Sequence, residues 1–142
     1  MTKKVLVPID GSTQSDDALE HALEEFGDDD ITVFHVIDPV DAGYSSPVAI
    51  PGGSEEWYES AKEEGEALFE EAQDVADEYG VTLDSATELG RPARTIVEFA
   101  DDEGFDHIVM GSHGREGVSR ILLGSVAETV VRRATMPVTV VR

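Results

Sequence analysis

The stretch from residue 111 to residue 125 holds the residue types best suited to binding chemistry. It begins with Gly-Ser-His-Gly at 111–114 and ends with Gly124 and Ser125. An apolar run typical of a buried strand precedes it, and a segment with helical spacing of apolar residues follows it. Glycines where a strand turns toward a helix let the backbone approach a ligand closely, and a helix N-terminus offers unpaired N–H groups to an anion. The stretch therefore predicts a phosphate cradle.

Other phosphate-binding and catalytic patterns are absent from the sequence. There is no GxxxxGK[ST] loop, no lysine lies beyond Lys62, and the turn at 10–13 (Asp-Gly-Ser-Thr) does not match GxGxxG. These absences disfavour Walker-type and dinucleotide sites. No HExxH pattern, metal cluster or locally spaced Ser/His/Asp set is present. Asp10 and His113 could still share one crevice, so slow nucleotide hydrolysis or phosphoryl transfer stays open as an alternative.

Length and composition limit the class of protein. The chain has 142 residues, which suits one domain spanning 1–142. It contains no cysteine, and this excludes disulfides, thiolate metal sites and cysteine nucleophiles. No apolar run has the length of a signal-peptide core or a membrane span. We therefore expect a soluble, cytoplasmic protein with no membrane partner.

The charge is distributed unevenly along the chain. The formal net charge is −21, yet residues 111–142 contain five arginines and only two acids. The acid-rich remainder resembles the proteins of salt-loving organisms, in which salt screens the self-repulsion. Such a surface disfavours nucleic acid as a partner, because phosphate backbones require a basic footprint. A small phosphorylated ligand at the local basic segment remains compatible with this distribution.

Apolar runs and helical spacing alternate along the chain. The predicted strands are 5–9, 31–37, 81–88, 106–110 and 137–141. The predicted helices contain 18–26, 54–79, 92–100 and 126–134, and residues 38–54, rich in proline and glycine, predict a long mobile loop. The order is therefore strand and helix in alternation, which predicts a parallel sheet with helices on both faces. A ligand then binds at the carboxyl ends of the strands, where Asp10 and Gly111 are the natural candidates.

The helix predicted over 54–79 is the longest. Ser54 can cap it, and like charges recur four residues apart on its outer face. Each such pair costs roughly 0.2–0.5 kcal/mol when it is unscreened, so this helix should be weaker at low salt. Its predicted buried stripe consists of Trp57, Tyr58, Ala61, Leu68, Ala72, Val75, Ala76 and Tyr79.

The glycine spacing and four further motifs carry a resemblance to a known family. The spacing is G-x2-G-x9-G-[ST], and the further motifs are Val-Pro-Ile-Asp-Gly-Ser at 7–12, His-Val-Ile-Asp at 35–38, Gly-Arg-Pro at 90–92 and Met-Pro-Val at 136–138. Together they resemble the ATP-binding branch of the universal stress protein family over essentially the whole chain. The resemblance implies an α/β fold of the adenine nucleotide alpha hydrolase-like type: one open parallel five-stranded sheet, strand order 3-2-1-4-5, with helices on both faces.

The resemblance also implies a ligand and a set of contacts. The ligand is ATP or another adenine nucleotide, with Mg²⁺ or Mn²⁺ bridged mainly through the phosphates. The implied residues at the adenosine end are Pro8, Ile9, Asp10 and Val36, and those around the phosphates are Gly111, His113, Gly114, Gly124, Ser125 and Val126. We add Met110 as the pocket floor and Arg115 as a phosphate partner.

Each of these residues also has a purely structural interpretation. The glycines could form a tight turn, Asp10 could cap a helix, Val36 could be plain core, and His113 could be a solvated loop histidine. The histidines at 21 and 35 are interpreted as structural.

The resemblance favours a regulatory or stress-response binding module over an enzyme. The alternatives are a slow ATPase or phosphotransferase using the same pocket, and a nucleotide-free dimeric scaffold. Members of the family commonly dimerise through the last strand, and the apolar strand at 137–142 has a predicted open edge. We therefore expect a homodimer.

Overall fold

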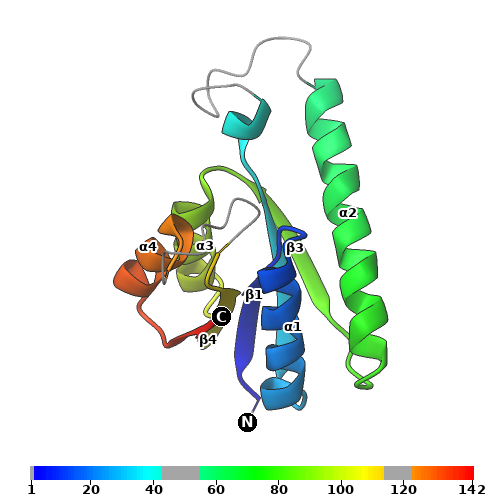
Figure 1. Ribbon diagram of the computed structural model, residues 1–142, viewed down its shortest axis with the longest axis vertical. Helices are drawn as coiled ribbons and strands as arrows, with labels where there is room; N and C mark the ends of the chain where they lie inside the picture. Colours follow the sequence, from blue (N-terminus) through cyan, green and yellow to red (C-terminus); the bar gives the residue numbers. More distant parts are fainter. Residues whose placement is uncertain (1, 43–54, 114–122) are drawn as a thin grey trace.

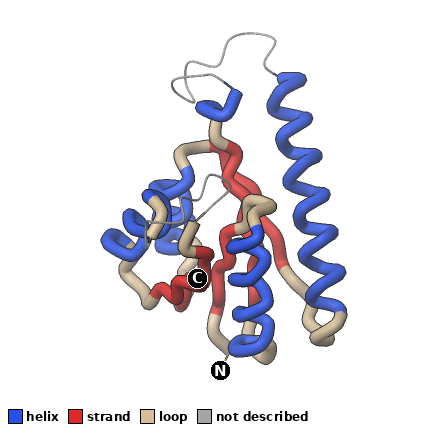
Figure 2. Tube along the Cα trace, viewed as in Figure 1, coloured by secondary structure: helices blue, strands red, loops and turns tan. Residues whose placement is uncertain are grey.

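The protein is a three-layer α/β domain with one parallel sheet at its centre. The computed structural model describes residues 2–42, 55–113 and 123–142. Its five strands lie in the order β3-β2-β1-β4-β5, and every adjacent pair is parallel. Figure 1 and Figure 2 show α1 and α2 on one side of the sheet and α3 and α4 on the other. The predicted fold and strand order are confirmed.

The elements follow one another with short connections wherever the structure describes them. In chain order they are β1 Lys4–Pro8, α1 Thr13–Phe26, β2 Asp30–Ile37, the 3-10 helix η1 Pro39–Ala42, α2 Glu55–Asp77, β3 Asp84–Leu89, α3 Pro92–Asp102, β4 His107–Gly111, α4 Ser125–Arg133 and β5 Val138–Val141. The loop predicted over 38–54 is thus wrong at its start, because a helical turn occupies Pro39–Ala42. Within the described ranges no helix is both long and apolar enough to cross a membrane.

The central strand β1 separates two apolar cores. Val5 and Val7 pack with the α1 and α2 side, whereas Leu6 packs with the α3 and α4 side. All three are completely buried, as expected for a parallel strand covered on both faces. The two cores fix the helices on either side, so the carboxyl ends of β1 and β4 are held in place by well-packed helices.

The third strand begins later than its sequence suggests. Residues 81–83 (Val-Thr-Leu) are predicted to belong to it, but the strand starts at Asp84. The reason is Gln73 on α2, whose side-chain amide donates to the Val81 carbonyl (2.9 Å) and accepts from the Leu83 N–H (2.9 Å). Those backbone groups are therefore satisfied by a helix side chain before the strand pairs with β2.

The long helix buries a narrower stripe than predicted. Its fully buried residues are Gly65, Ala72 and Ala76. The predicted burial of Tyr79 is wrong, because α2 ends at Asp77 and the tyrosine, just before the turn at Gly80 (φ +69°), is 41% exposed. The predicted cap Ser54 lies outside the described residues.

Candidate functional site

The carboxyl ends of β1 and β4 lie side by side. Residues of the two strands pair directly, with Leu6 opposite Ile108. Beyond the strands, the first turn of α1 approaches β4 so closely that a Cβ on Gly111 would lie 2.7 Å from the Cβ of Gln14 and 2.8 Å from its backbone. The prediction that the Asp10 and Gly111 strand ends meet is therefore confirmed. The contact also explains Gly111 structurally, since a larger residue would push α1 away.

The turn after β1 is held by its own polar side chains. The Asp10 carboxylate accepts from the Ser12 N–H (2.9 Å), and Gly11 adopts a left-handed conformation with φ +83°. The Ser12 hydroxyl in turn accepts from the Ser15 N–H (3.1 Å), which caps α1. Asp10 is half-buried in this turn. Asp10 therefore stabilises the turn that leads into α1.

The segment after β4 contains a buried histidine nitrogen. Ser112 is 4% exposed, and its N–H donates to the Val141 carbonyl (2.8 Å). Its hydroxyl lies 3.1 Å from Nδ1 of His113, which orients the ring. The other ring nitrogen, Nε2, is buried and has no hydrogen-bond partner among the described residues. Leaving a buried polar atom unpaired costs about 1–3 kcal/mol, so it calls for a partner such as a ligand.

The N-terminus of α4 lies against this histidine. A Cβ on the N-cap residue Gly124 would meet the Ser112 carbonyl oxygen at 3.0 Å and the His113 Cδ2 at 3.5 Å. Within the described ranges no side chain caps α4, whereas Ser12 caps α1. An uncapped helix N-terminus presents free N–H groups and a partial positive charge, which suit an anion.

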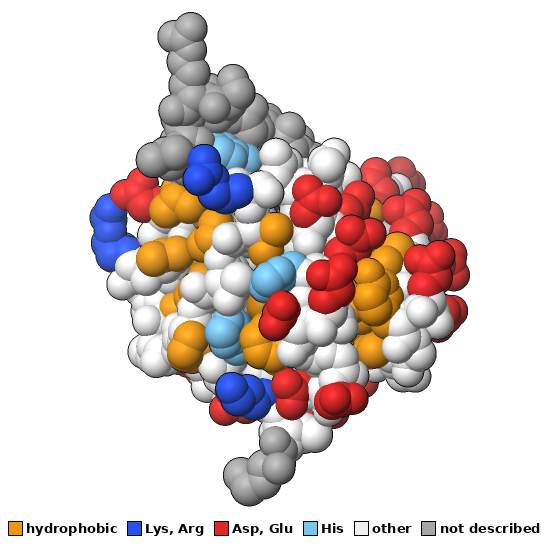
Figure 3. Space-filling view, turned by 60° about the horizontal axis from the view of Figure 1, so that its bottom comes forward, with side chains coloured by type: hydrophobic (Ala, Val, Ile, Leu, Met, Phe, Trp, Pro, Cys, Tyr) orange, Lys and Arg blue, Asp and Glu red, His pale blue; other side chains and the backbone are white. Residues whose placement is uncertain are grey.

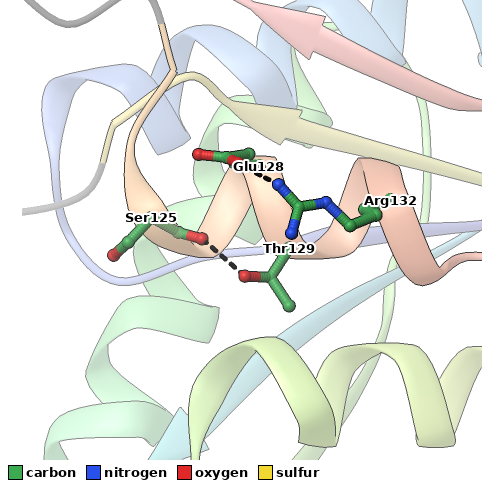
Figure 4. A network of polar contacts seen from close by, with 4 residues as sticks. All are labelled: Ser125, Glu128, Thr129 and Arg132. Atoms are coloured by element: carbon green, nitrogen blue, oxygen red, sulfur yellow. Dashed lines mark hydrogen bonds and ion pairs between the residues drawn. The ribbon is translucent and has the colours of Figure 1, made fainter.

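The first residues of α4 keep their polar groups available. The Ser125 carbonyl accepts from the Thr129 hydroxyl (2.9 Å), while the Ser125 hydroxyl points away from that bond (Figure 4). Glu128, the acid of the first turn, accepts a hydrogen bond from Arg132, so its charge is balanced by a cation. Val126 is half-buried against the α3 and α4 core. The helix start is therefore exposed, polar and electrostatically suited to a phosphate.

The remaining predicted residues are divided between the two faces of the sheet. Met110 (5% exposed) and the half-buried Val36 lie in or against the α3 and α4 core. The Ile9 side chain (7% exposed) lies in the α1 and α2 core, and Pro8 is half-buried at the end of β1. Gly114 and Arg115 lie outside the described residues. Val36 and Met110 thus share a face, whereas Ile9 belongs to the other one.

The α1 and α2 side has the opposite electrostatic character. A hollow of about 270 Å³ between these helices is lined by three carboxylates and an apolar floor: Ile9, Gly11, Asp16, Leu19, Glu20, Leu68, Glu71, Ala72 and Val75. Burial, followed by the nearby charge of Glu71, raises the pKa of Asp16. Figure 3 shows acidic side chains gathered on the same side of the molecule as α2 in Figure 1. A phosphate ligand would be repelled there.

These features define a class of protein: an open parallel α/β domain whose candidate site lies at the carboxyl ends of β1 and β4. The universal stress protein family model matches residues 1–142, and the chain belongs to that family. The universal stress protein MJ0531 of Methanocaldococcus jannaschii is 41% identical over 145 residues, covering 99% of this chain and 82% of the relative. The universal stress protein YxiE of Bacillus subtilis is 34% identical over 148 residues, covering all of both chains.

Solved structures of the family superpose closely. The structure of MJ0577 matches with a TM-score of 0.84 and 33% identity over 99% of this chain and 96% of the other. A universal stress protein in complex with cAMP matches with 0.71 and 26% over 99% and 97%. An Arabidopsis thaliana family member with AMP bound matches with 0.70 and 25% over 98% and 90%. Members of this family with the same fold therefore bind adenine nucleotides.

Proposed function

We propose that this protein is an adenine-nucleotide-binding regulatory module of the stress response, with ATP as its principal ligand. The observation that carries the proposal is the buried Nε2 of His113, which has no hydrogen-bond partner among the described residues, beside the start of α4, which no described side chain caps. A phosphate oxygen would accept a hydrogen bond from this nitrogen and from the N–H groups of the first turn of α4. The two relatives with bound AMP and cAMP support the adenine end of the ligand.

The two ends of the proposed ligand meet different surfaces. The adenosine would lie near Asp10, against Val36 and Met110 on the α3 and α4 face of the sheet. The phosphates would lie at Gly111, His113, Gly124 and Ser125, where the basic part of the chain begins. The sequence motif adds Gly114 and Arg115 to this end. Mg²⁺ or Mn²⁺ would be held mainly by phosphate oxygens, as the family resemblance implies.

The first experiment identifies the ligand directly. Nucleotide is released from the purified protein by denaturation and analysed by mass spectrometry, and ATP, AMP and cAMP are then titrated calorimetrically. We expect adenine nucleotide in the released fraction and binding of ATP in the presence of Mg²⁺. ATP recovered intact after long incubation with Mg²⁺ would support a binding module over a hydrolase. A wild-type protein that binds none of the three nucleotides contradicts the proposal.

A second experiment tests the position of the phosphates. His113→Asn deletes the Nε2 position but keeps a polar group near Nδ1 for Ser112, whereas His113→Gln restores a nitrogen near Nε2. Loss of a hydrogen bond to a charged group weakens binding roughly 10-fold or more, so we expect this loss in the asparagine variant and partial rescue in the glutamine variant. His21→Asn on α1 serves as the matched control. A Gly114→Glu variant that bound ATP normally would also count against this site.

We also propose that two copies pair through residues 137–142. β5 is an outer strand of the sheet, paired on one side with β4, and its residues Val138–Val141 are apolar or β-branched and only half-buried. Such a strand is a template for pairing with a second copy. Light scattering in molar KCl, which screens the acidic surface, should give the mass of a dimer. A monomer mass under these conditions would contradict the pairing.

A further inference from the structure

The ring of His35 occupies the point where β1 and β2 part. Registered pairing ends at Pro8 and Phe34, and the Ile9 N–H still donates to the Phe34 carbonyl (2.8 Å). The Ile9 carbonyl lies 3.1 Å from Nδ1 of His35. Because a carbonyl can only accept, Nδ1 must carry the proton and donate. A side chain of β2 therefore bonds the last carbonyl before Asp10.

The opposite side of the same ring is held by α2. Gly65 is buried in the middle of this helix, and a Cβ there would lie 3.0 Å from the His35 Cδ2 and 3.6 Å from its Cγ. Glycine inside a helix costs about 1 kcal/mol relative to alanine, so its presence calls for a packing reason. The imidazole is that reason, since it fills the space that a side chain of α2 would take.

The peptide unit between Ile9 and Asp10 is thus held at both of its polar atoms. Its carbonyl accepts from His35, and its N–H donates to the Ser15 hydroxyl (3.4 Å). The Asp10 carboxylate is fixed further by the Ser12 N–H. With the peptide plane set by one residue from β2 and one from α1, the position of Asp10 at the strand end is determined before any ligand arrives.

We propose that His35 is a positioning residue of the nucleotide site, which presents Asp10 to the adenosine end of the ligand. The inference rests on the proposed function and deepens it. His35 acts on the ligand through the Ile9–Asp10 peptide and touches no phosphate. Its loss should therefore weaken adenosine, AMP and ATP by the same factor, whereas loss of the His113 nitrogen should weaken only the phosphorylated ligands.

Two substitutions separate this role from simple packing. His35→Asn places an amide nitrogen near Nδ1 and can still donate to the Ile9 carbonyl, whereas His35→Gln carries its amide farther out, near the Nε2 position. Calorimetry is performed at a temperature at which circular dichroism shows both variants to be folded. We expect near-wild-type affinities for His35→Asn and about a tenfold loss for all three ligands in His35→Gln. A purely structural role would not follow this order at equal folding.

A third variant changes the contact between the His35 ring and α2. Gly65→Ala adds a Cβ at 3.0 Å from the imidazole and replaces glycine by a better helix former, so it perturbs the ring without weakening α2 intrinsically. We expect an equal, smaller loss of affinity for adenosine, AMP and ATP. If wild-type protein binds nucleotide and neither His35→Gln nor Gly65→Ala changes the affinity, the role of His35 is overturned while the proposed function stands. If the wild type binds no nucleotide, both proposals fall.

Discussion

Two helices begin at the same edge of the sheet, and their N-termini are completed differently. At the start of α1, the Ser12 hydroxyl accepts from the Ser15 N–H, and the Ser12 carbonyl accepts from the Asp16 N–H. At the start of α4 the Gly124 carbonyl likewise accepts from the Glu128 N–H, but among the described residues no side chain caps the helix, and the adjacent His113 has a buried nitrogen without a partner there. The two helix starts therefore differ in their side chains, and the proposed function assigns the phosphates to the start of α4.

The charges around the two helix starts reinforce the difference. Asp10, Asp16 and Asp17 surround the start of α1, and burial together with the charges of Glu71, Asp17 and Asp10 raises the pKa of Asp16. At α4 the acid of the first turn, Glu128, is paired with Arg132. A helix N-terminus therefore becomes an anion site only where capping and local charge both leave it available.

The largest expected effect is on stability, at the contact between Gly111 of β4 and the first turn of α1. Gly111→Ala places a Cβ 2.7 Å from the Cβ of Gln14 and 2.8 Å from its backbone, so α1 must shift. Overpacking of this kind costs about 2–3 kcal/mol of unfolding free energy. Gly124→Ala, whose nearest contact is 3.0 Å, should cost less. Urea unfolding measures both variants, and equal costs would show that the contact with α1 is not the tighter one.

The comparison between helix starts is tested most directly by adding an acid to each. Ser125 and Thr13 are the first residues of α4 and α1, and both are exposed. Ser125→Asp should stabilise the free protein by about 0.3–1 kcal/mol and weaken ATP binding at least about tenfold, because its charge faces the phosphates.

The matched variant Thr13→Asp lies at the start of the helix that has its own cap. It should leave the ATP affinity unchanged and add less stability, because Asp16 and Asp17 repel the new charge. Calorimetry with ATP and thermal unfolding without it measure the two effects separately. Equal losses of affinity in Thr13→Asp and Ser125→Asp would remove the distinction between the two helix starts.

Removing a serine hydroxyl from each helix start should have a smaller effect on stability. Here the larger effect is expected at α1. Ser12→Ala deletes the cap of α1 and should cost about 1 kcal/mol of unfolding free energy. Ser125→Ala should cost only a few tenths of a kcal/mol, because the described side chains, that of Ser125 included, make no capping bond at α4. Chemical denaturation in the absence of nucleotide gives both values. A larger loss for Ser125→Ala would mean that its hydroxyl already serves the fold.

The smallest effect concerns a histidine whose ring nitrogen already has a partner. Nε2 of His107 lies 2.7 Å from the Thr139 hydroxyl, and burial, with smaller effects of Lys3 and His21, lowers the His107 pKa. The unfolded chain therefore binds the proton more readily, and stability should decrease as the pH falls below the ordinary histidine value of 6.5. His107→Gln should reduce this decrease. The free energy of unfolding is measured between about pH 7.5 and about pH 5.5, roughly one unit on either side of that value. An unchanged slope would exclude His107 as its source.

Much of the architecture could be predicted because short-range patterns determine it. Alternating apolar runs and helical stripes gave the element order, and parallel topology then placed Asp10 and Gly111 at one edge. The start of β3 was mispredicted because Gln73, ten residues before Leu83, takes bonds that a strand partner would otherwise make. The packing of Gly111 against Gln14 could not be predicted either, since it depends on how closely α1 packs against β4.

The sequence contains one signal for the His35 contact. A glycine at position 65, inside an otherwise strong helical pattern, indicates close approach by another part of the chain. The sequence does not say which part approaches. Only the structure shows that the imidazole of His35 fills the space beside Gly65, and that the same ring reaches the Ile9 carbonyl.

The amide of Gln73 has a consequence for how copies of this protein assemble. By bonding residues 81 and 83 it shortens β3, which is left as an outer strand with exposed Asp84 and Glu88. Charged side chains on an outer strand resist the addition of another chain. The opposite outer strand, β5, consists of three valines and a threonine and carries no charge. With the proposed pairing at β5 and a charged edge at β3, the sheet would close after a single two-fold partner, so dimers would not continue into filaments.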